Sequence, residues 1–221
     1  MNAAALLHLL QFASPALPIG GYSYSQGLEA AIEQGLVRDA ASARAWIASY
    51  LADVMATWDA PLLWRLMQAF TNGDMDAVAL WSERFIASRD TFELRAESIQ
   101  MGYSLVRLIA ELGVADVAGL GDEVALPTAF ACAVVALGVP PAEALIAWLF
   151  AWAENQVLVC VKSVPLGQVA GQRLLLSLRA DIEEAAAGAQ GIPDEAMSNW
   201  APGLSMLSMQ HEVQHGRLYR S

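Results

Sequence analysis

The chain has 221 residues, of which 56% are apolar and only 16% charged, and its formal net charge is −11. A chain this apolar is not disordered, and its charged share lies below the about 25% typical of soluble domains, so we expect a protein partner to cover part of the apolar excess. Its few basic residues disfavour binding to nucleic acid or to an anionic membrane surface.

The first elements are short and helical in pattern. Residues 3–12 are almost wholly apolar and predict a short helix, which the two prolines and two glycines of residues 14–21 end. A second helix is predicted from Ser23 to Gln34, before Gly35. A third is predicted from Asp39 to about Thr57, because its apolar residues recur at three- and four-residue spacing.

The later elements begin at recognisable start signals. Asp59 followed by Pro61 predicts a new helix, Thr91 is expected to cap a long one, and Pro165 is expected to separate the last two. The remaining predicted helices span residues 74–88, 127–137, 141–163 and 165–187. These patterns favour a single all-α domain of packed helices over residues 1–221, in which residues 194–221 form a C-terminal tail that is flexible or ordered by a partner.

Localisation follows from two further features of the sequence. The most apolar stretch, residues 124–153, is interrupted by prolines, so neither half reaches the about 20 residues of a spanning helix. The first basic residue is Arg38, so the positive region of a secretory signal is missing. We expect a cytoplasmic protein without a membrane segment.

The segment from His211 to His215 reads H-E-V-Q-H and matches a zinc-protease pattern. That chemistry needs both imidazoles on one helical face, Glu212 as base and a third ligand. Only six residues follow His215, and Gly216 is expected to stop the helix. A metal-dependent hydrolase is therefore the lesser alternative, beside a metal contact completed by a partner and an ordinary polar tail helix.

Other catalytic patterns are incomplete. Lys162, the only lysine, is followed by Ser163 but preceded by no glycines, so a phosphate-binding loop is excluded there. Three histidines, two of them in the tail, leave little for a nucleophilic triad. Paired acids such as Glu93 and Glu97 are interpreted as solvated or paired helix faces. We expect no catalytic residue, no metal ligand and no cofactor.

Three polar segments remain candidates for contact with a partner. Residues 154–173 place amide and charged side chains among apolar neighbours, so they satisfy one another inside the fold or face a partner. Residues 20–29 form either a capped helix start or a docking patch rich in tyrosine. Residues 216–221 form either a frayed terminus or an anchor in which two arginines flank an aromatic side chain.

Together these segments resemble the UreF family of urease accessory proteins. The resemblance is carried in order by residues 10–29 (LQFASPALPIGGYSYSQGLE), 93–102 (ELRAESIQMG), 152–156 (WAENQ) with Lys162, 165–173 (PLGQVAGQR), and the terminal 208–212 and 217–221. It implies an all-α fold, a homodimer and no catalysis of its own. It also implies a scaffold and regulator that joins UreD (UreH in some species) and the GTPase UreG in the complex that inserts nickel into the urease apoprotein.

The same segments supply the predicted partner-binding residues. The tail and residues 22–29 are expected to contact UreD, and residues 162–173 to support the dimer or the contact with UreG. A nickel-passing conduit lined by polar side chains is a further alternative. The predicted partner-binding residues are Tyr22, Tyr24, Gln26, Glu29, Arg95, Glu97, Glu154, Gln156, Lys162, Gln168, Gln172, Arg173, His211, Glu212, Arg217, Tyr219 and Arg220.

Overall fold

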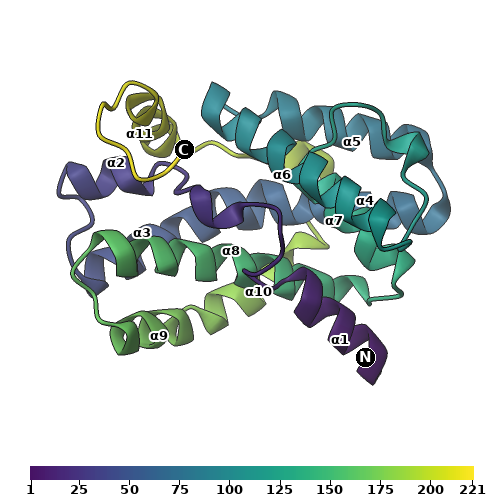
Figure 1. The fold of residues 1–221 in the computed structure, drawn as a ribbon, viewed down its shortest axis with the longest axis horizontal. Helices are drawn as coiled ribbons and strands as arrows, with labels where there is room; N and C mark the ends of the chain where they lie inside the picture. The colour runs from purple at the N-terminus through teal and green to yellow at the C-terminus, as the bar shows by residue number, and fades with distance from the viewer.

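The computed structural model describes residues 1–221 as one bundle of helices without strands, which confirms the all-α prediction. Figure 1 shows α1 projecting from one corner of the bundle, with α11 and the last residue near α2 at the far end. The helices are α1 (Ala3–Phe12), η1 (Gly21–Ser23), α2 (Leu28–Glu33), α3 (Ala40–Tyr50), η2 (Leu51–Asp59), α4 (Ala60–Asn72), α5 (Met75–Ala87), α6 (Phe92–Glu111), η3 (Ala118–Leu120), α7 (Leu126–Ala136), α8 (Pro141–Ser163), α9 (Gln168–Ser177), α10 (Arg179–Ala189), η4 (Asp194–Ala196) and α11 (Pro202–Glu212).

Side-chain caps start the helices where the sequence predicts them. The Asp39 carboxylate accepts from the Ser42 N–H at 2.8 Å and so opens α3. The Thr91 hydroxyl accepts from the Leu94 N–H at 3.2 Å and opens α6. Such caps satisfy backbone N–H groups that have no partner within the helix.

The core lies where α4, α7, α8 and α10 pack together with η2. On α4, three leucines and Met67 are fully buried, and on α8 so are Leu145 and Leu149. Helix α8 is long and apolar enough to cross a membrane by composition, yet half of its most apolar window is buried inside the protein. Because α8 packs against α1, α2, α3, α4, α7, α9 and α10, it is the central helix of the bundle.

Three predicted boundaries were wrong, and the first has a clear cause. The second helix does not begin at Ser23: α2 begins at Leu28, because Gln26 and Gly27 have φ values of 56° and 80°. A right-handed helix cannot pass through such residues. The segment before Leu28 is therefore held open, which exposes its backbone groups to the tail described below.

The second error concerns Asp59 and Pro61, which do not start a new helix. The helical backbone continues without a break from α3 through η2 to α4, and η2 is a π-helical stretch within it. Pro61 has no N–H for the carbonyl of Thr57, and that carbonyl instead accepts from the Ser198 N–H at 3.1 Å. An outside donor thus replaces the missing helical hydrogen bond.

The third error is the long last helix, since the chain divides at Leu178 into α9 and α10. The expected separation after α8 is confirmed: α8 ends at Ser163, two residues before Pro165.

On α6, Gly102 lies so close to the chain before α7 that an added Cβ would be 2.0 Å from the carbonyl oxygen of Val124. The absence of a side chain there lets α6 and α7 pack tightly.

Candidate functional site

The tail, residues 194–221, lies against the body of the bundle. Helix α11 packs on α2 and α6, and residues 213–221 return toward the open segment before α2. Figure 1 shows the last residue beside α2. We call the contact between residues 208–221 and the body the tail junction. The carboxylates of three glutamates of the body, Glu29, Glu93 and Glu97, take part in about half of its hydrogen bonds.

Glu29, in the first turn of α2, accepts two backbone hydrogen bonds from the tail and contacts the ring of His211. The backbone N–H of Leu218 donates to Oε1 at 2.7 Å, and that of Tyr219 donates to Oε2 at 3.0 Å. His211 Nε2 lies 3.0 Å from Oε2. Glu29 is only 7% exposed, so these partners replace the water that its carboxylate would otherwise bind.

Glu93, near the start of α6, binds the same histidine from the other side. His211 Nδ1 lies 2.6 Å from Glu93 Oε2, and Arg217 donates to Oε1. The Glu212 carboxylate accepts from the Glu93 N–H at 3.1 Å. His211 is completely buried between the two carboxylates. The imidazole therefore joins α2, α6 and α11 at one point.

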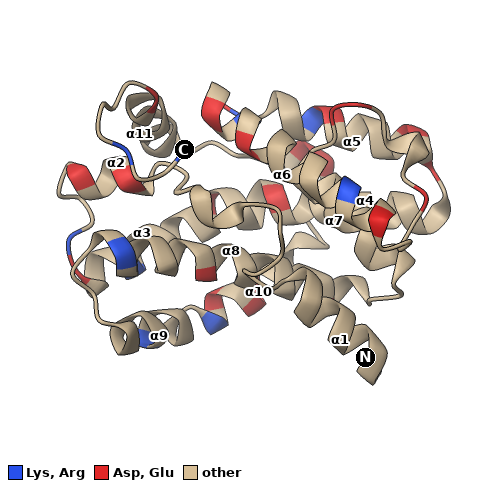
Figure 2. Ribbon diagram, viewed as in Figure 1, with Lys and Arg blue, Asp and Glu red and all other residues tan.

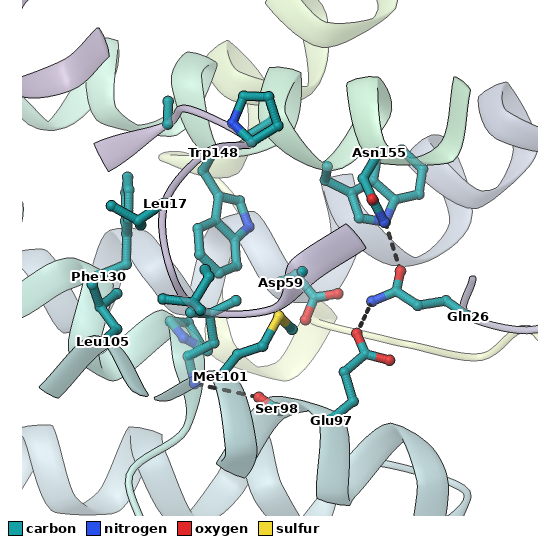
Figure 3. Close-up of a pocket in the computed structure, with 18 of the residues that line it drawn as sticks. Leu17, Gln26, Asp59, Glu97, Ser98, Met101, Leu105, Phe130, Trp148 and Asn155 are labelled. Atoms are coloured by element: carbon teal, nitrogen blue, oxygen red, sulfur yellow. Dashed lines mark hydrogen bonds between the residues drawn. The ribbon is translucent and has the colours of Figure 1, made fainter. Parts of the chain in front are cut away.

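Glu97, one turn further along α6, accepts from the Ser221 hydroxyl at 2.5 Å and from Gln26 Nε2 at 2.5 Å. The indole of Trp152 donates to Gln26 Oε1 at 2.8 Å and so fixes the orientation of that amide. Figure 3 shows Gln26 and Glu97 joined in this way. Burial raises the pKa of Glu97 to about 7, against the lowering effect of the hydrogen bonds from Ser221 and Gln26.

The open segment before α2 supplies the backbone part of the junction. The N–H groups of Ser25 and Gln26 donate to the oxygen of Ser221 at 2.8 and 3.1 Å, and the Ser25 hydroxyl donates to it at 2.5 Å. On α8, Asn155 donates to the carbonyl of Tyr24 at 3.0 Å, and Gln156 to that of Ser25 at 3.3 Å. The amide nitrogens of Asn155 and Gln156 thus find acceptors inside the fold, whereas the Gln156 Oε1 atom is buried without a hydrogen-bond partner.

We expect Glu97→Gln to flatten the pH dependence of stability. Folded Glu97 keeps its proton up to about pH 7, whereas the unfolded chain loses it near its ordinary value of 4.5. As pH rises between these values, the unfolded state ionises first, so this group's contribution to stability falls by about 3 kcal/mol in total. Glutamine cannot ionise and can still bond to Gln26 and Ser221.

Urea unfolding from pH 4.5 to 8 measures this difference. The free energy of unfolding of Glu97→Gln minus that of the wild type should grow with pH. Glu111→Gln, on the same helix at a side chain that is 67% exposed, is the matched control and should follow the wild type. Parallel curves for Glu97→Gln and the wild type would show that Glu97 is ionised throughout this range.

The structure brings ten of the predicted residues to the junction or its border and leaves the others outside. Those at the junction or on the segments that form it are Tyr24, Gln26, Glu29, Glu97, Gln156, His211, Glu212, Arg217, Tyr219 and Arg220. Those elsewhere are Tyr22, Arg95, Glu154, Lys162, Gln168, Gln172 and Arg173.

The outlying residues have separate surroundings. Tyr22 is 62% exposed at the edge of a cavity, and Arg95 forms an exposed ion pair with Glu123 at 3.1 Å. Burial raises the pKa of Glu154 on α8. Lys162 is exposed, with its Nζ 6.0 Å from the centre of the Tyr219 ring. The last three of these residues lie on α9 and are exposed to solvent: Gln168, Gln172 and Arg173.

The sequence interpretation of Glu93 and Glu97 as a solvated or paired helix face was right for the pairing of Glu93, with His211 and Arg217, and wrong for solvation. They are not a solvated helix face: Glu97 is 3% exposed, the side chain of Glu93 is 13% exposed, and both hold the tail. Their four-residue spacing placed them on one face of α6 but did not reveal what covers it. Ser25, Trp152 and Ser221 also belong to the junction and were missed as individual residues.

The zinc-protease pattern does not form its geometry. Helix α11 ends at Glu212, so His211 is helical whereas His215 lies beyond the helix and is exposed. His211 is already bonded to Glu29 and Glu93. No group of three or more His, Cys, Asp or Glu side chains is arranged to hold a metal ion. The alternative of a hydrolase built on these residues therefore has no structural support.

A cavity of about 160 Å³ lies next to the junction (Figure 3). Leu17, Leu105 and Phe130 form its apolar end, and Glu97 lies at the other end. There Asp59 forms a buried ion pair with Arg89 at 3.1 Å, and burial raises the pKa of Asp59. The lining is mainly apolar, which fits a packed interior better than a path for a hydrated ion.

Comparison with known proteins gives one consistent result. Residues 37–179 match the model of the UreF family. A protein named urease accessory protein UreF from Janthinobacterium sp. (strain Marseille) is 64% identical over the full length of both chains. Proteins with the same name from Nitrosospira multiformis and from Azoarcus sp. are 56% and 50% identical, over 98% of this chain and 98% and 95% of their own.

Proposed function

Because the chain belongs to the UreF family of urease accessory proteins, we propose that it is a non-catalytic scaffold in the cytoplasmic complex that inserts nickel into apo-urease. In that complex it joins UreD (UreH) to the GTPase UreG, regulates the GTPase, and acts as a homodimer. In this role its own side chains recognise other proteins, and the nickel is the ion that the whole complex delivers.

The tail junction is the observation that carries this proposal. The glutamates hold the backbone of residues 217–221 in one conformation, while Leu218 remains 76% exposed and the side chains of Arg217 and Arg220 lie at the surface. Val213 is also 76% exposed. Less conformational entropy is lost on binding when a partner meets a segment already held in place. Exposed arginine and apolar side chains are typical of protein interfaces.

We assign the tail and residues 22–29 to UreD, and residues 162–173 to UreG or the dimer. The two regions differ in kind. The tail presents apolar and arginine side chains, whereas α9 presents Gln168, Gln172 and Arg173. Lys162, the first residue of the second region, lies beside Tyr219 of the tail, so the two regions adjoin there.

We expect deletion of residues 216–221 to abolish co-purification with UreD. The deletion removes the exposed terminal segment but leaves α11 and its buried His211 in place. Affinity pull-down of tagged chain with UreD and UreG measures the loss, and circular dichroism confirms that the helices remain. Arg173→Ala is the control, since it alters the other region and should retain UreD. A truncated chain that still captured UreD at wild-type strength would refute the tail assignment.

A further inference from the structure

The ring of His211, on α11, lies between two carboxylates in the tail junction. Its Nδ1 atom is 2.6 Å from Glu93 Oε2, and its Nε2 atom is 3.0 Å from Glu29 Oε2. The imidazole is completely buried, so water replaces neither partner. A neutral imidazole has one N–H donor and one acceptor nitrogen, whereas an ionised carboxylate only accepts. The two hydrogen bonds therefore require one proton more than a neutral ring and two ionised carboxylates supply.

The surroundings of the two carboxylates place this additional proton on the ring. Glu29 also accepts from the backbone N–H groups of Leu218 and Tyr219. Glu93 also accepts from the guanidinium of Arg217. Donors of this kind favour the ionised form of a carboxylate. Both ring nitrogens then carry hydrogen, and the positive charges of the imidazolium and of Arg217 balance the negative charges of the two glutamates.

The other acids near the ring, on α2, α6 and the tail, do not bond to its nitrogens. Glu97 bonds to the Ser221 hydroxyl, and the Glu212 carboxylate accepts from the Glu93 N–H at 3.1 Å. Glu33, the other acid of α2, is exposed to solvent. Figure 2 shows acidic residues of α2 close to basic residues of the loop that follows α11. The ring is therefore held by one carboxylate from α2 and one from α6.

We propose that His211 is a proton-operated latch for the tail, which docks when the ring carries both protons and undocks when one of them is lost. Loss of a proton leaves one ring nitrogen with its lone pair facing a carboxylate oxygen in a site without water. An imidazole in water loses its second proton at about pH 6.5, so above this pH the undocking of the tail releases a proton. The ratio of docked to undocked tail then falls by up to about tenfold for each unit of pH.

Hydrogen exchange of the Leu218 and Tyr219 amides in the full chain tests the latch between about pH 7.5 and 9. We expect their protection factors, corrected for the intrinsic exchange rate, to fall in the wild type by up to about tenfold per pH unit. In His211→Gln, which cannot ionise, protection should be lower at pH 7.5 and independent of pH. His215→Gln is the matched control, because it removes an exposed histidine beyond α11, and it should follow the wild type.

Glu97→Gln separates the latch from the other buried acid of the junction. Burial raises the pKa of Glu97 to about 7, so this carboxyl is ionised over most of the measured range. The variant should therefore keep the pH dependence of the wild type. Loss of that dependence in Glu97→Gln would assign the proton to Glu97 and overturn the inference.

NMR of the ring nitrogens of His211 in the wild type reads the proton directly, whether or not His211→Gln keeps its helices by circular dichroism. At pH 7.5 both nitrogens should carry hydrogen while the tail is docked. A neutral ring in the docked chain, wild-type protection that does not change with pH, or an unchanged slope in His211→Gln would each overturn the inference. These measurements need no partner, so their failure leaves the proposed scaffold role to the pull-down.

Discussion

Glu29→Ala is expected to destabilise the tail junction by about 3–5 kcal/mol. The substitution removes one carboxylate that serves three partners: the N–H groups of Leu218 and Tyr219 lose their acceptor, and the ring of His211 loses its contact, all in a buried site. Hydrogen bonds to a charged group contribute about 1.5–3 kcal/mol each to stability. Removing one partner of a buried charged pair destabilises a protein by about 3–5 kcal/mol. The contributions of neighbours in one network are not additive.

Hydrogen exchange of the amides of Leu218 and Tyr219 measures the local effect, and urea unfolding the global one. Exchange at both positions should approach the rate of an unprotected amide. Glu33→Ala is the control, because Glu33 is exposed on the same helix and should change neither measurement. Retained protection of the Leu218 and Tyr219 amides in Glu29→Ala would mean that Glu29 does not hold the tail.

Gly102→Ala is expected to destabilise the whole fold by about 3 kcal/mol or more. The new Cβ would lie 2.0 Å from the carbonyl oxygen of Val124 and 2.7 Å from the carbonyl carbon of Ala125. These are backbone atoms, so no side-chain rotation relieves the overlap, and α6 and α7 must move apart. Overpacking of a close helix contact is among the few mechanisms that give effects of this size.

Gly188→Ala is the control, and we expect it to change the stability in the opposite direction. Gly188 lies within α10 with no atom within 4 Å of an added Cβ. Alanine favours a helix over glycine by up to about 1 kcal/mol, so this variant should be slightly more stable than the wild type. Thermal unfolding of both variants compares them directly. Equal stability of Gly102→Ala and the wild type would contradict the close packing of α6 against α7.

The local sequence was sufficient for the all-α fold and for several helix starts, and insufficient for the site. Asp39 and Thr91 mark helix starts because the capping group lies within three residues of its donor. The junction depends instead on pairs such as Glu29 and His211, which are 182 residues apart in sequence. No local pattern specifies which distant segment will satisfy a glutamate, so Glu29 could be selected as a candidate but not assigned a partner.

The errors at Gln26 and Pro61 have a related origin. Serine, tyrosine and glutamine before Leu28 are compatible with a helix, and the left-handed conformation of Gln26 becomes favourable only when Ser221 and Glu97 bond to this segment. Pro61 breaks a helix unless an outside donor serves the carbonyl that it leaves free, and Ser198 supplies that donor. In both places a tertiary contact overrides the local preference.

Reconstituted urease activation tests most directly whether the chain works by joining other proteins. Apo-urease, nickel, GTP, UreD and UreG are combined with the wild-type chain, with the chain lacking residues 216–221, or with none, and the nickel content and activity of urease are measured. We predict activation with the wild-type chain only, and no GTP turnover by the chain alone. Equal activation by the truncated chain, or activation without UreD and UreG, would contradict the scaffold role.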